Sequence, residues 1–387
     1  MSCQETIVAY LLGVLAAVTL PAAPPQFEAH AIAEVANASQ VFPIDVNHDG
    51  KIDLIVLAGG TADLVWFENP SWQRHVIAGG LKGMINLAAW DTDGDGIPEI
   101  VVARAFSARP KESLGIISLL KHSGDPRGLW TMTEIDRLPA SHRFRLADID
   151  GSGQKVLVDS PLAASDALPP DYYGHVPLVF YRPGEWKREL IDDSNEGVVH
   201  GLAATDWDQK GHDDILVAGF TGVRLYKLGK NGRWTHTQLL KGDPSPRPKT
   251  GASEIAVGHL GAERFLATVE PWHGNQVVVY RQHGSGWRRE VIDDSLSYAH
   301  TLATADFSGE GRDQILAGCR DQPVRVYIYD FDGKRWNRQT VDEGIAANSC
   351  AVADLNGDGR PDIACAGMAT NNLKWYENLG PAKSTQR

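Results

Sequence analysis

The sequence has little positive charge. In a chain of 387 residues, 37 Lys and Arg stand against 49 Asp and Glu, which gives a formal net charge of −12. Nucleic acids and anionic membranes attract proteins with a net positive charge, so neither is an expected partner. Bound cations would instead neutralise part of the excess.

Long hydrophobic runs are also missing, apart from residues 7–23. That run is too short and too interrupted by Gly and Pro for a stable membrane span. It ends in small residues, as a signal peptide does, although no Lys or Arg precedes it. We interpret residues 1–25 as a candidate signal peptide or leader, and we expect export to the periplasm or the extracellular space.

Cysteine is scarce, with four residues in the chain. Cys3 falls in the candidate leader, whereas Cys319, Cys350 and Cys365 fall in expected strands. We expect these three to pack as small apolar side chains. A Cys350–Cys365 disulfide across one hairpin is the alternative, and it would require demanding geometry.

Short acidic loops are abundant. Residues 354–362 read DLNGDGRPD, with Gly359 at the turn, which is the spacing of a short calcium loop. Strand-like runs flank this loop on both sides, which argues against an EF-hand. Related units recur at spacings of 46 to 58 residues, with the first Asp or its counterpart at positions 45, 91, 148, 206, 259, 306 and 354.

A period of this length built from short strands is typical of a β-propeller with one four-stranded sheet per blade. We predict an all-β fold, a single seven-bladed β-propeller over residues 26–380, with a tail at 381–387. Six Trp-led fourth strands follow a third strand, and the seventh is missing from the C-terminal end. We therefore expect the N-terminal strand near residues 27–33 to complete the last blade and close the ring.

Three loops carry complete sets of calcium ligands, to which we assign a structural role. The sets are Asp45, Asn47, Asp49 and Asp53; Asp91, Asp93, Asp95 and Glu99; and Asp354, Asn356, Asp358 and Asp362. In the fourth blade Lys210 stands where the third acid is expected, so its ammonium group could replace the ion.

Histidines gather on the opposite face. His142, His200 and His300 occupy equivalent positions at the start of innermost strands, so we expect them to ring the mouth of the central channel. His175 and His273 lie in loops on the same face. Clustered imidazoles can act as general acid and base, or can bind a divalent transition metal at His142, His200 and His300. The alternative is that each only holds neighbouring strands in register.

Further side chains are expected at this mouth. Arg104, Glu270 and Arg320 end second strands there, and Tyr172, Tyr173, Trp272 and Tyr298 would supply aromatic walls. A concave site with convergent polar and aromatic groups is typical of small-molecule binding, and sugars stack on aromatic faces.

The loop units resemble FG-GAP/VCBS repeats, the calcium-loop repeats of propellers. More narrowly, the strand starts HGLAATDWD and HTLATADF, together with EPWHGNQVVVY, resemble the propeller domain of the aldos-2-ulose dehydratase/isomerase family. Members of that family eliminate water from the keto-sugar 1,5-anhydrofructose in a propeller followed by cupin domains. The resemblance covers the propeller and implies dehydratase chemistry.

These observations lead to a hypothesis of β-elimination on a keto-sugar or related saccharide by a carbon–oxygen lyase. His200 or His300 would serve as base and acid, and His142 as metal ligand or enolate donor. Arg104 or Arg320 would stabilise the anion, while Trp272 and His273 position the sugar ring. The alternatives are a non-catalytic calcium-stabilised propeller that binds carbohydrate or protein, and a purely structural one. The sequence gives no indication of oligomeric state.

Overall fold

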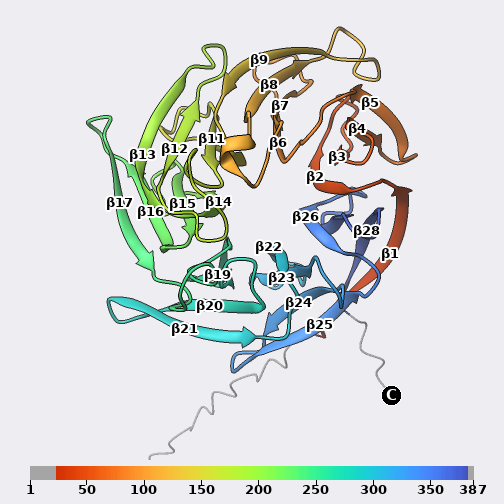
Figure 1. Ribbon diagram of the computed structural model, residues 1–387. Helices are drawn as coiled ribbons and strands as arrows, with labels where there is room; N and C mark the ends of the chain where they lie inside the picture. The colour runs from red at the N-terminus through yellow and green to blue at the C-terminus, as the bar shows by residue number, and fades with distance from the viewer. Residues whose placement is uncertain (1–22, 382–387) are drawn as a thin grey trace, which may run out of the picture.

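The computed structural model describes residues 23–381, which form seven antiparallel sheets of four strands arranged around a central channel (Figure 1). The predicted seven-bladed all-β propeller is therefore confirmed. One short 3-10 helix, η1 (Pro110–Glu112), lies between two strands. Among the described residues, no helix is long and apolar enough to cross a membrane. The candidate leader lies almost wholly outside the described residues.

Each blade is described from the strand at the channel to the strand at the rim, which is also the sequence order in every blade except the last. Blades 1 to 3 consist of β2 (Ala38–Ile44), β3 (Asp53–Ala58), β4 (Asp63–Glu68) and β5 (Gln73–Ala78); β6 (Asn86–Trp90), β7 (Glu99–Arg104), β8 (Ile116–Lys121) and β9 (Thr131–Arg137); and β10 (Ser141–Ala147), β11 (Val156–Pro161), β12 (His175–Tyr181) and β13 (Arg188–Glu196). Blades 4 and 5 consist of β14 (Val199–Thr205), β15 (Asp214–Gly219), β16 (Gly222–Leu228) and β17 (Trp234–Leu240); and β18 (Glu254–Leu260), β19 (Glu263–Glu270), β20 (Gln276–His283) and β21 (Gly286–Asp293). Blades 6 and 7 consist of β22 (Ala299–Ala305), β23 (Gln314–Cys319), β24 (Val326–Phe331) and β25 (Trp336–Asp342); and β26 (Ala347–Ala353), β27 (Asp362–Gly367), β28 (Asn372–Pro381) and β1 (Pro25–Glu34).

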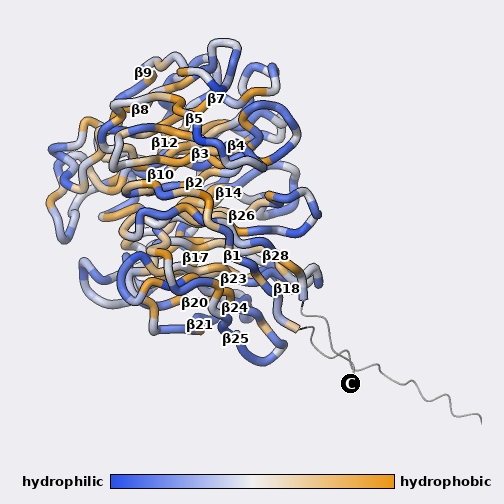
Figure 2. The backbone as a smooth tube through the Cα atoms, turned by 90° about the vertical axis from the view of Figure 1, so that its right-hand side faces the viewer, coloured by the Kyte–Doolittle hydropathy of each residue, from blue (hydrophilic) through white to orange (hydrophobic). Residues whose placement is uncertain are grey.

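Burial follows the position of a strand in its blade. The second strands are almost entirely buried, and β15 and β27 are buried at every residue, because neighbouring blades cover both of their faces. The fourth strands alternate or are largely exposed, as in β9. Figure 2 shows the result in side view, with apolar stretches inside the ring and hydrophilic loops at its two faces.

A repeated tyrosine ties successive blades together. Tyr181 of β12 donates a hydrogen bond of 2.7 Å to Asp136 at the end of β9, in the preceding blade. The same pairing recurs between later blades, as Tyr226 with Asp192, Tyr329 with Asp293 and Tyr376 with Asp342. These bonds explain the acidic residue that ends most fourth strands, because a buried phenol requires an acceptor.

The last blade combines both ends of the described chain. Strand β1 pairs antiparallel with β28, so that Glu28 lies opposite Glu377 and His30 lies opposite Trp375. In Figure 1 the red β1 runs beside the blue β28 at the edge of this blade. The ring is therefore joined by strand pairing between residues from its two ends.

The expectation for the cysteines of this blade is wrong. Cys350 and Cys365 form a disulfide rather than packing as free thiols. The two residues lie directly opposite each other in the β26–β27 pair, with Cα atoms 4.1 Å apart, so the required proximity comes from the strand register. Cys319 is a free, buried thiol, as expected.

Candidate functional site

The histidines at the channel are unpaired residues of strand irregularities. In β14 the pairing with β15 skips His200, and in β22 the pairing with β23 skips His300. The same irregularity falls at His142 in β10. In a β-bulge the side chain of the extra residue no longer follows the regular alternation between the two faces of the sheet. Bulges at equivalent positions of successive blades therefore direct these imidazoles to one place. His273 reaches them from the β19–β20 loop with a positive φ of 47°.

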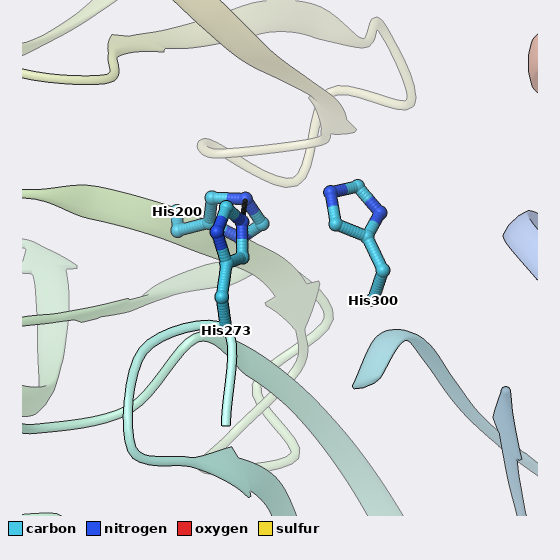
Figure 3. A group of neighbouring side chains, drawn as sticks. All are labelled: His200, His273 and His300. Carbon is cyan, nitrogen blue, oxygen red and sulfur yellow. Dashed lines mark hydrogen bonds between the residues drawn. The ribbon is translucent and has the colours of Figure 1, made fainter. Parts of the chain in front are cut away.

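Three of these imidazoles form a compact group. His200, His273 and His300 each offer one ring nitrogen, and the three nitrogens lie within 4.8 Å of one another. The Nε2 atoms of His200 and His273 are 2.8 Å apart, and the ring centroids of His200 and His300 are 5.2 Å apart. Figure 3 shows the rings of His200 and His273 in contact, with His300 facing them from another blade.

Carbonyl and carboxylate oxygens fix the tautomers of two of the rings. His300 donates from Nδ1 to the backbone carbonyl of Asn348 over 2.7 Å. In His200, Nδ1 lies 3.0 Å from Oε1 of Glu254 and 3.1 Å from the carbonyl of Ser253, and both partners can only accept. Each Nδ1 therefore carries the proton, which leaves the lone pair on Nε2.

A buried ion pair supports the group from behind. The guanidinium of Arg143 lies 3.0 Å from Glu254 and also donates to the backbone carbonyl of His200 over 2.6 Å. Burial alone would raise the pKa of Glu254, but the charge of Arg143 and the hydrogen bond from His200 outweigh it and lower this pKa to about 2. Glu254 is thus a carboxylate facing an imidazole N–H.

The histidines themselves are neutral at ordinary pH. Burial, followed by the charges of Arg143 and the other rings, lowers the pKa of His142 well below its usual value. Burial and the neighbouring His200 do the same to the pKa values of His273 and His300. The pKa of His200 is lowered by burial and Arg143, against the opposing effect of Glu254. Neutral imidazoles with a fixed Nδ1 proton fit a divalent transition metal, and they also fit a general base.

The group lies between two hollows. A cavity of about 410 Å³ on the channel side is lined by His300, Arg143 and Glu254, among others. A second hollow of about 540 Å³ is lined by His273, Tyr298 and Lys249, among others. A small molecule in either hollow would touch one of the imidazoles.

Aromatic rings cover the outer side of the group. The Trp272 ring stacks on His273 with centroids 4.5 Å apart, and Tyr298 lies 4.5 Å from the same imidazole. The guanidinium of Arg320 lies over Tyr298 at 5.1 Å. Tyr172 reaches Trp272 at 5.8 Å and donates its hydroxyl to the carbonyl of Ala108. These four predicted residues therefore surround the histidines.

His142 does not occupy the place predicted for it in a metal site. Its ring is 4.9 Å from that of His200, but His273 takes its place in the group of three nitrogens. Within residues 23–381 the buried Nδ1 of His142 has no hydrogen-bond partner. The hypothesised trio of His142, His200 and His300 is thus replaced by His200, His273 and His300.

Four other predicted residues lie elsewhere. Arg104 donates to Ser118 within blade 2. Glu270 is fully buried inside blade 5, where it accepts hydrogen bonds from Thr268, Tyr280 and Arg289. His175 is exposed at the start of β12, and Tyr173 is exposed beside Arg247. Each lies at or near the end of a strand or in a loop, where the direction of a side chain is not set by the repeat.

Arg143 and Glu254 were not identified from the sequence. Each directly follows a repeat position already singled out, His142 or Ser253, at the start of an innermost strand. A charged residue at the start of an innermost strand was the available signal.

The acidic residues of the predicted calcium loops make two kinds of contact. The first Asp of each loop binds backbone N–H groups, as Asp45 does with Asp49 and Gly50. The last acids Asp53 and Asp362 are buried, and each accepts two backbone N–H bonds. In blade 2, carboxylate oxygens of Asp91, Asp93 and Glu99 lie within 4.8 Å of one another.

Lysine ammonium groups enter two of these loops. In blade 4, Lys210 donates to Asp208 over 2.9 Å, as expected of an ammonium group that replaces an ion. In blade 2, Lys121 lies 3.1 Å from Asp93 and 3.2 Å from Glu99. That second contact was not anticipated from the loop sequence, because Lys121 comes from β8.

Comparison with known proteins supports the expected resemblance. The model of a family described as aldos-2-ulose dehydratase, beta-propeller domain, matches residues 114–283, a range that contains His142, His200 and His273. The FG-GAP-like repeat matches residues 45–102 and 306–365. The chain is thus a propeller with FG-GAP-like repeats that resembles the aldos-2-ulose dehydratase propeller domain.

A curated relative points the same way. Aldos-2-ulose dehydratase of Phanerodontia chrysosporium is 28% identical over 308 residues, which make up 69% of this chain and 33% of the relative. The chain therefore spans about a third of the length of that protein.

A solved structure with low sequence identity shares the fold. A chain in the crystal structure of BBS1N in complex with ARL6DN has a TM-score of 0.58 and 11% identity, over 93% of this chain and 98% of that one. Rhamnogalacturonan lyase YesW has a TM-score of 0.49 and 13% identity, over 95% of this chain and 76% of that one.

Proposed function

We propose that this protein is a carbohydrate-active lyase of the dehydratase type, which eliminates water from a keto-sugar at the histidine cluster. The observation that carries the proposal is the group of neutral imidazoles formed by the buried His200 and the half-buried His273 and His300, with Glu254 and Arg143 behind it. The similarity to a protein named aldos-2-ulose dehydratase supports the substrate class. If these histidines only held strands in register, there would be no reason for three imidazoles and an ion pair to meet at one place.

His300 is the base favoured by this geometry. It lines the channel cavity, and its Nδ1–H bond to Asn348 leaves the Nε2 lone pair available. His200 is less suited, because its Nε2 already lies 2.8 Å from His273 and 3.2 Å from Arg143. In the proposed step, Nε2 takes the proton from the carbon next to the carbonyl, and the electron pair of that C–H bond forms an enolate.

The second half of the step releases water. The enolate electrons form a carbon–carbon double bond as the neighbouring C–O bond breaks, and the leaving hydroxyl takes the proton held by His300. Substrate therefore becomes an unsaturated ketone plus water, and the imidazole returns to its neutral form. Arg143, which lines the same cavity as His300, would stabilise developing negative charge.

A divalent transition metal is part of the proposal. His200 and His273 would hold it, which leaves Nε2 of His300 free as the base, and when bound it would polarise the substrate carbonyl and so acidify the adjacent C–H bond. Calcium would be held by the acidic loops in a structural role. In this proposal, residues 1–25 serve as a leader that directs export of the protein from the cytoplasm.

Turnover of keto-sugars, including 1,5-anhydrofructose, tests the proposal through the near-ultraviolet absorbance of the enone product. We expect His300→Ala to reduce turnover by about 100-fold or more, the usual size of an acid–base contribution. His236→Ala removes an exposed histidine of β17 and serves as the control. Sugar binding without turnover in the wild-type protein, or full turnover in His300→Ala, would favour the non-catalytic propeller.

Metal analysis of the purified protein separates the two roles of the cluster. We expect a transition metal that is lost in the triple variant His200→Ala, His273→Ala, His300→Ala while calcium remains. Turnover without any transition metal would leave His300 as a base and would refute the metal part alone.

A further inference from the structure

Two blades share a polar arrangement on their outer strands. In blade 1, His75 of β5 stacks on Trp66 with centroids 4.6 Å apart, and its Nε2 lies 2.8 Å from Oε2 of Glu68. Asn47, from the acidic loop of the same blade, donates to the other oxygen of Glu68 over 3.0 Å. The third strand ends in WFE at Glu68, and Asn69 follows it, so residues 66–69 read WFEN.

Blade 7 repeats the arrangement at the joint of the ring. Its third strand reads WYEN, and His30 of β1 stacks on Trp375 with centroids 4.6 Å apart. The Nε2 of His30 lies 3.1 Å from Oε2 of Glu377, whose other oxygen accepts from Asn356 over 3.2 Å. Here the histidine and the glutamate come from opposite ends of the chain, 347 residues apart.

The two blades differ in how the glutamate is neutralised. In blade 1, the guanidinium of Arg127 pairs with Glu68, and Gln73 stands two residues before His75. In blade 7, no Lys or Arg within residues 23–381 pairs with Glu377, and Glu28 stands two residues before His30. Blade 7 thus replaces a cation and an amide with a second carboxylate.

That second carboxylate lies in an unfavourable place unless a cation binds. Glu28 is directly opposite Glu377 in the β1–β28 register, and like charges placed opposite each other weaken a strand pair. One ligand atom each from Glu28, His30 and Glu377 lies within 4.8 Å of the others. His30 and Glu377 remain about one third and one quarter exposed, so an ion can reach them.

We propose that Glu28, His30 and Glu377 form a zinc-binding site across the strand pair that closes the propeller. One imidazole nitrogen and two carboxylate oxygens form a ligand set that Zn²⁺ accepts, with water completing the coordination. The ion would take the place that the Arg127 guanidinium has in blade 1. Because its ligands come from β1 and β28, it would stabilise the closed ring over any state in which these strands are apart.

Zinc binding by the full chain tests this site, with equilibrium dialysis for stoichiometry and thermal unfolding for stability. We expect Glu28→Gln, which reproduces the glutamine of blade 1, and His30→Ala each to lose one zinc ion per chain or to weaken its binding by about tenfold or more. His75→Ala is the matched control, because it removes the corresponding stacked histidine of blade 1. It should retain the wild-type stoichiometry.

The effect of Glu28→Gln on the unfolding temperature should differ in sign between zinc-free and zinc-bound protein. With chelator present, Glu28→Gln should unfold at the same or a higher temperature than wild type, because it removes a repulsion. With zinc present, wild type should be the more stable protein. Unchanged zinc affinity in both variants, or an equal loss in His75→Ala, would overturn the proposal.

The result is separable from that of the channel cluster. Alanine at His200, His273 and His300 removes the proposed channel site and leaves β1 untouched. A zinc ion that survives in this triple variant and disappears when Glu28→Gln is added identifies the strand-pair site, whether or not the channel binds metal.

Discussion

The carboxylate of Glu254 lies 3.0 Å from Nδ1 of His200, and neither side chain is exposed by more than one tenth. Glu254 also lines the channel cavity, but its pKa of about 2 makes it a much weaker base than His300 for the proposed step. It acts through His200, by fixing which ring nitrogen keeps the proton and by holding the ring in place.

Glu254→Gln should therefore weaken transition-metal binding by about 10- to 100-fold and lower kcat, while KM changes little. The amide retains the size of the side chain, but it loses the charge that faces both His200 and Arg143. Metal titration together with steady-state kinetics checks this expectation. Glu263→Gln is the control, because Glu263 is a partly exposed carboxylate of the same blade that pairs with Arg281. Identical metal affinity in Glu254→Gln and wild type would contradict the role given to Glu254.

Asp159 should make stability depend on pH. Burial raises its pKa to about 8, although Ser141 donates a hydrogen bond to it. Between pH 3.8 and about pH 8, Asp159 is protonated in the folded protein but ionised in the unfolded chain. The free energy of unfolding therefore decreases as the pH rises through this range.

Asp159→Asn removes this dependence, and above pH 8 it should be more stable than wild type by roughly 1 to 3 kcal/mol. Urea unfolding of both proteins at pH 5 and pH 9 measures the difference. Asp166→Asn makes the same charge change on an exposed loop and should leave the pH dependence unchanged. A constant gap between Asp159→Asn and wild type across this range would be inconsistent with a protonated Asp159.

Removal of calcium should destabilise the propeller. Chelation with EGTA is expected to lower the unfolding temperature by about 2 to 4 °C for each kcal/mol lost. Asp49→Asn in the blade 1 loop should reduce this response. Lys210→Gln, at the corresponding position of blade 4, should not, because an ammonium group already pairs with Asp208 there. An unfolding temperature that ignores EGTA would show that the loops are held by their backbone hydrogen bonds alone.

The disulfide in blade 7 should contribute measurably to stability. Cys350 and Cys365 are 15 residues apart, and closing a loop of this length is worth about 3 kcal/mol or less. We expect the double variant Cys350→Ser, Cys365→Ser to lose about 1 to 3 kcal/mol and to become insensitive to dithiothreitol. Cys319→Ser should keep the response to the reductant. Equal urea midpoints for oxidised and reduced wild type would refute this contribution.

The repeat made most of the fold predictable. Equivalent positions of successive units occupy equivalent places around the ring, so the spacing of the Asp loops predicted seven blades and brought His200 and His300 to the channel. The same symmetry placed Trp272 and His273 together, since they share a loop next to the channel.

Features that depend on one blade alone were less predictable. Glu270 ends a second strand, but its side chain turns into its own blade, where Tyr280 and Arg289 bind it. The Lys121 contact to Asp93 and the Arg143 contact to Glu254 join residues that are distant in sequence and show no common spacing. The disulfide depends on the register of β26 and β27, which places Cys350 opposite Cys365. The alternation of residues in the sequence does not define this register to within one residue.

The pairing of β1 with β28 also has a consequence for biosynthesis. Among the strands of residues 23–381, β1 is synthesised first and its partner β28 is synthesised last. Until then the nascent chain carries an unsatisfied β-edge that can capture the wrong partner, including another copy of itself. A stop codon or frameshift that removes β28 would therefore cost two strands of the blade, and the truncated product would be prone to intermolecular assembly.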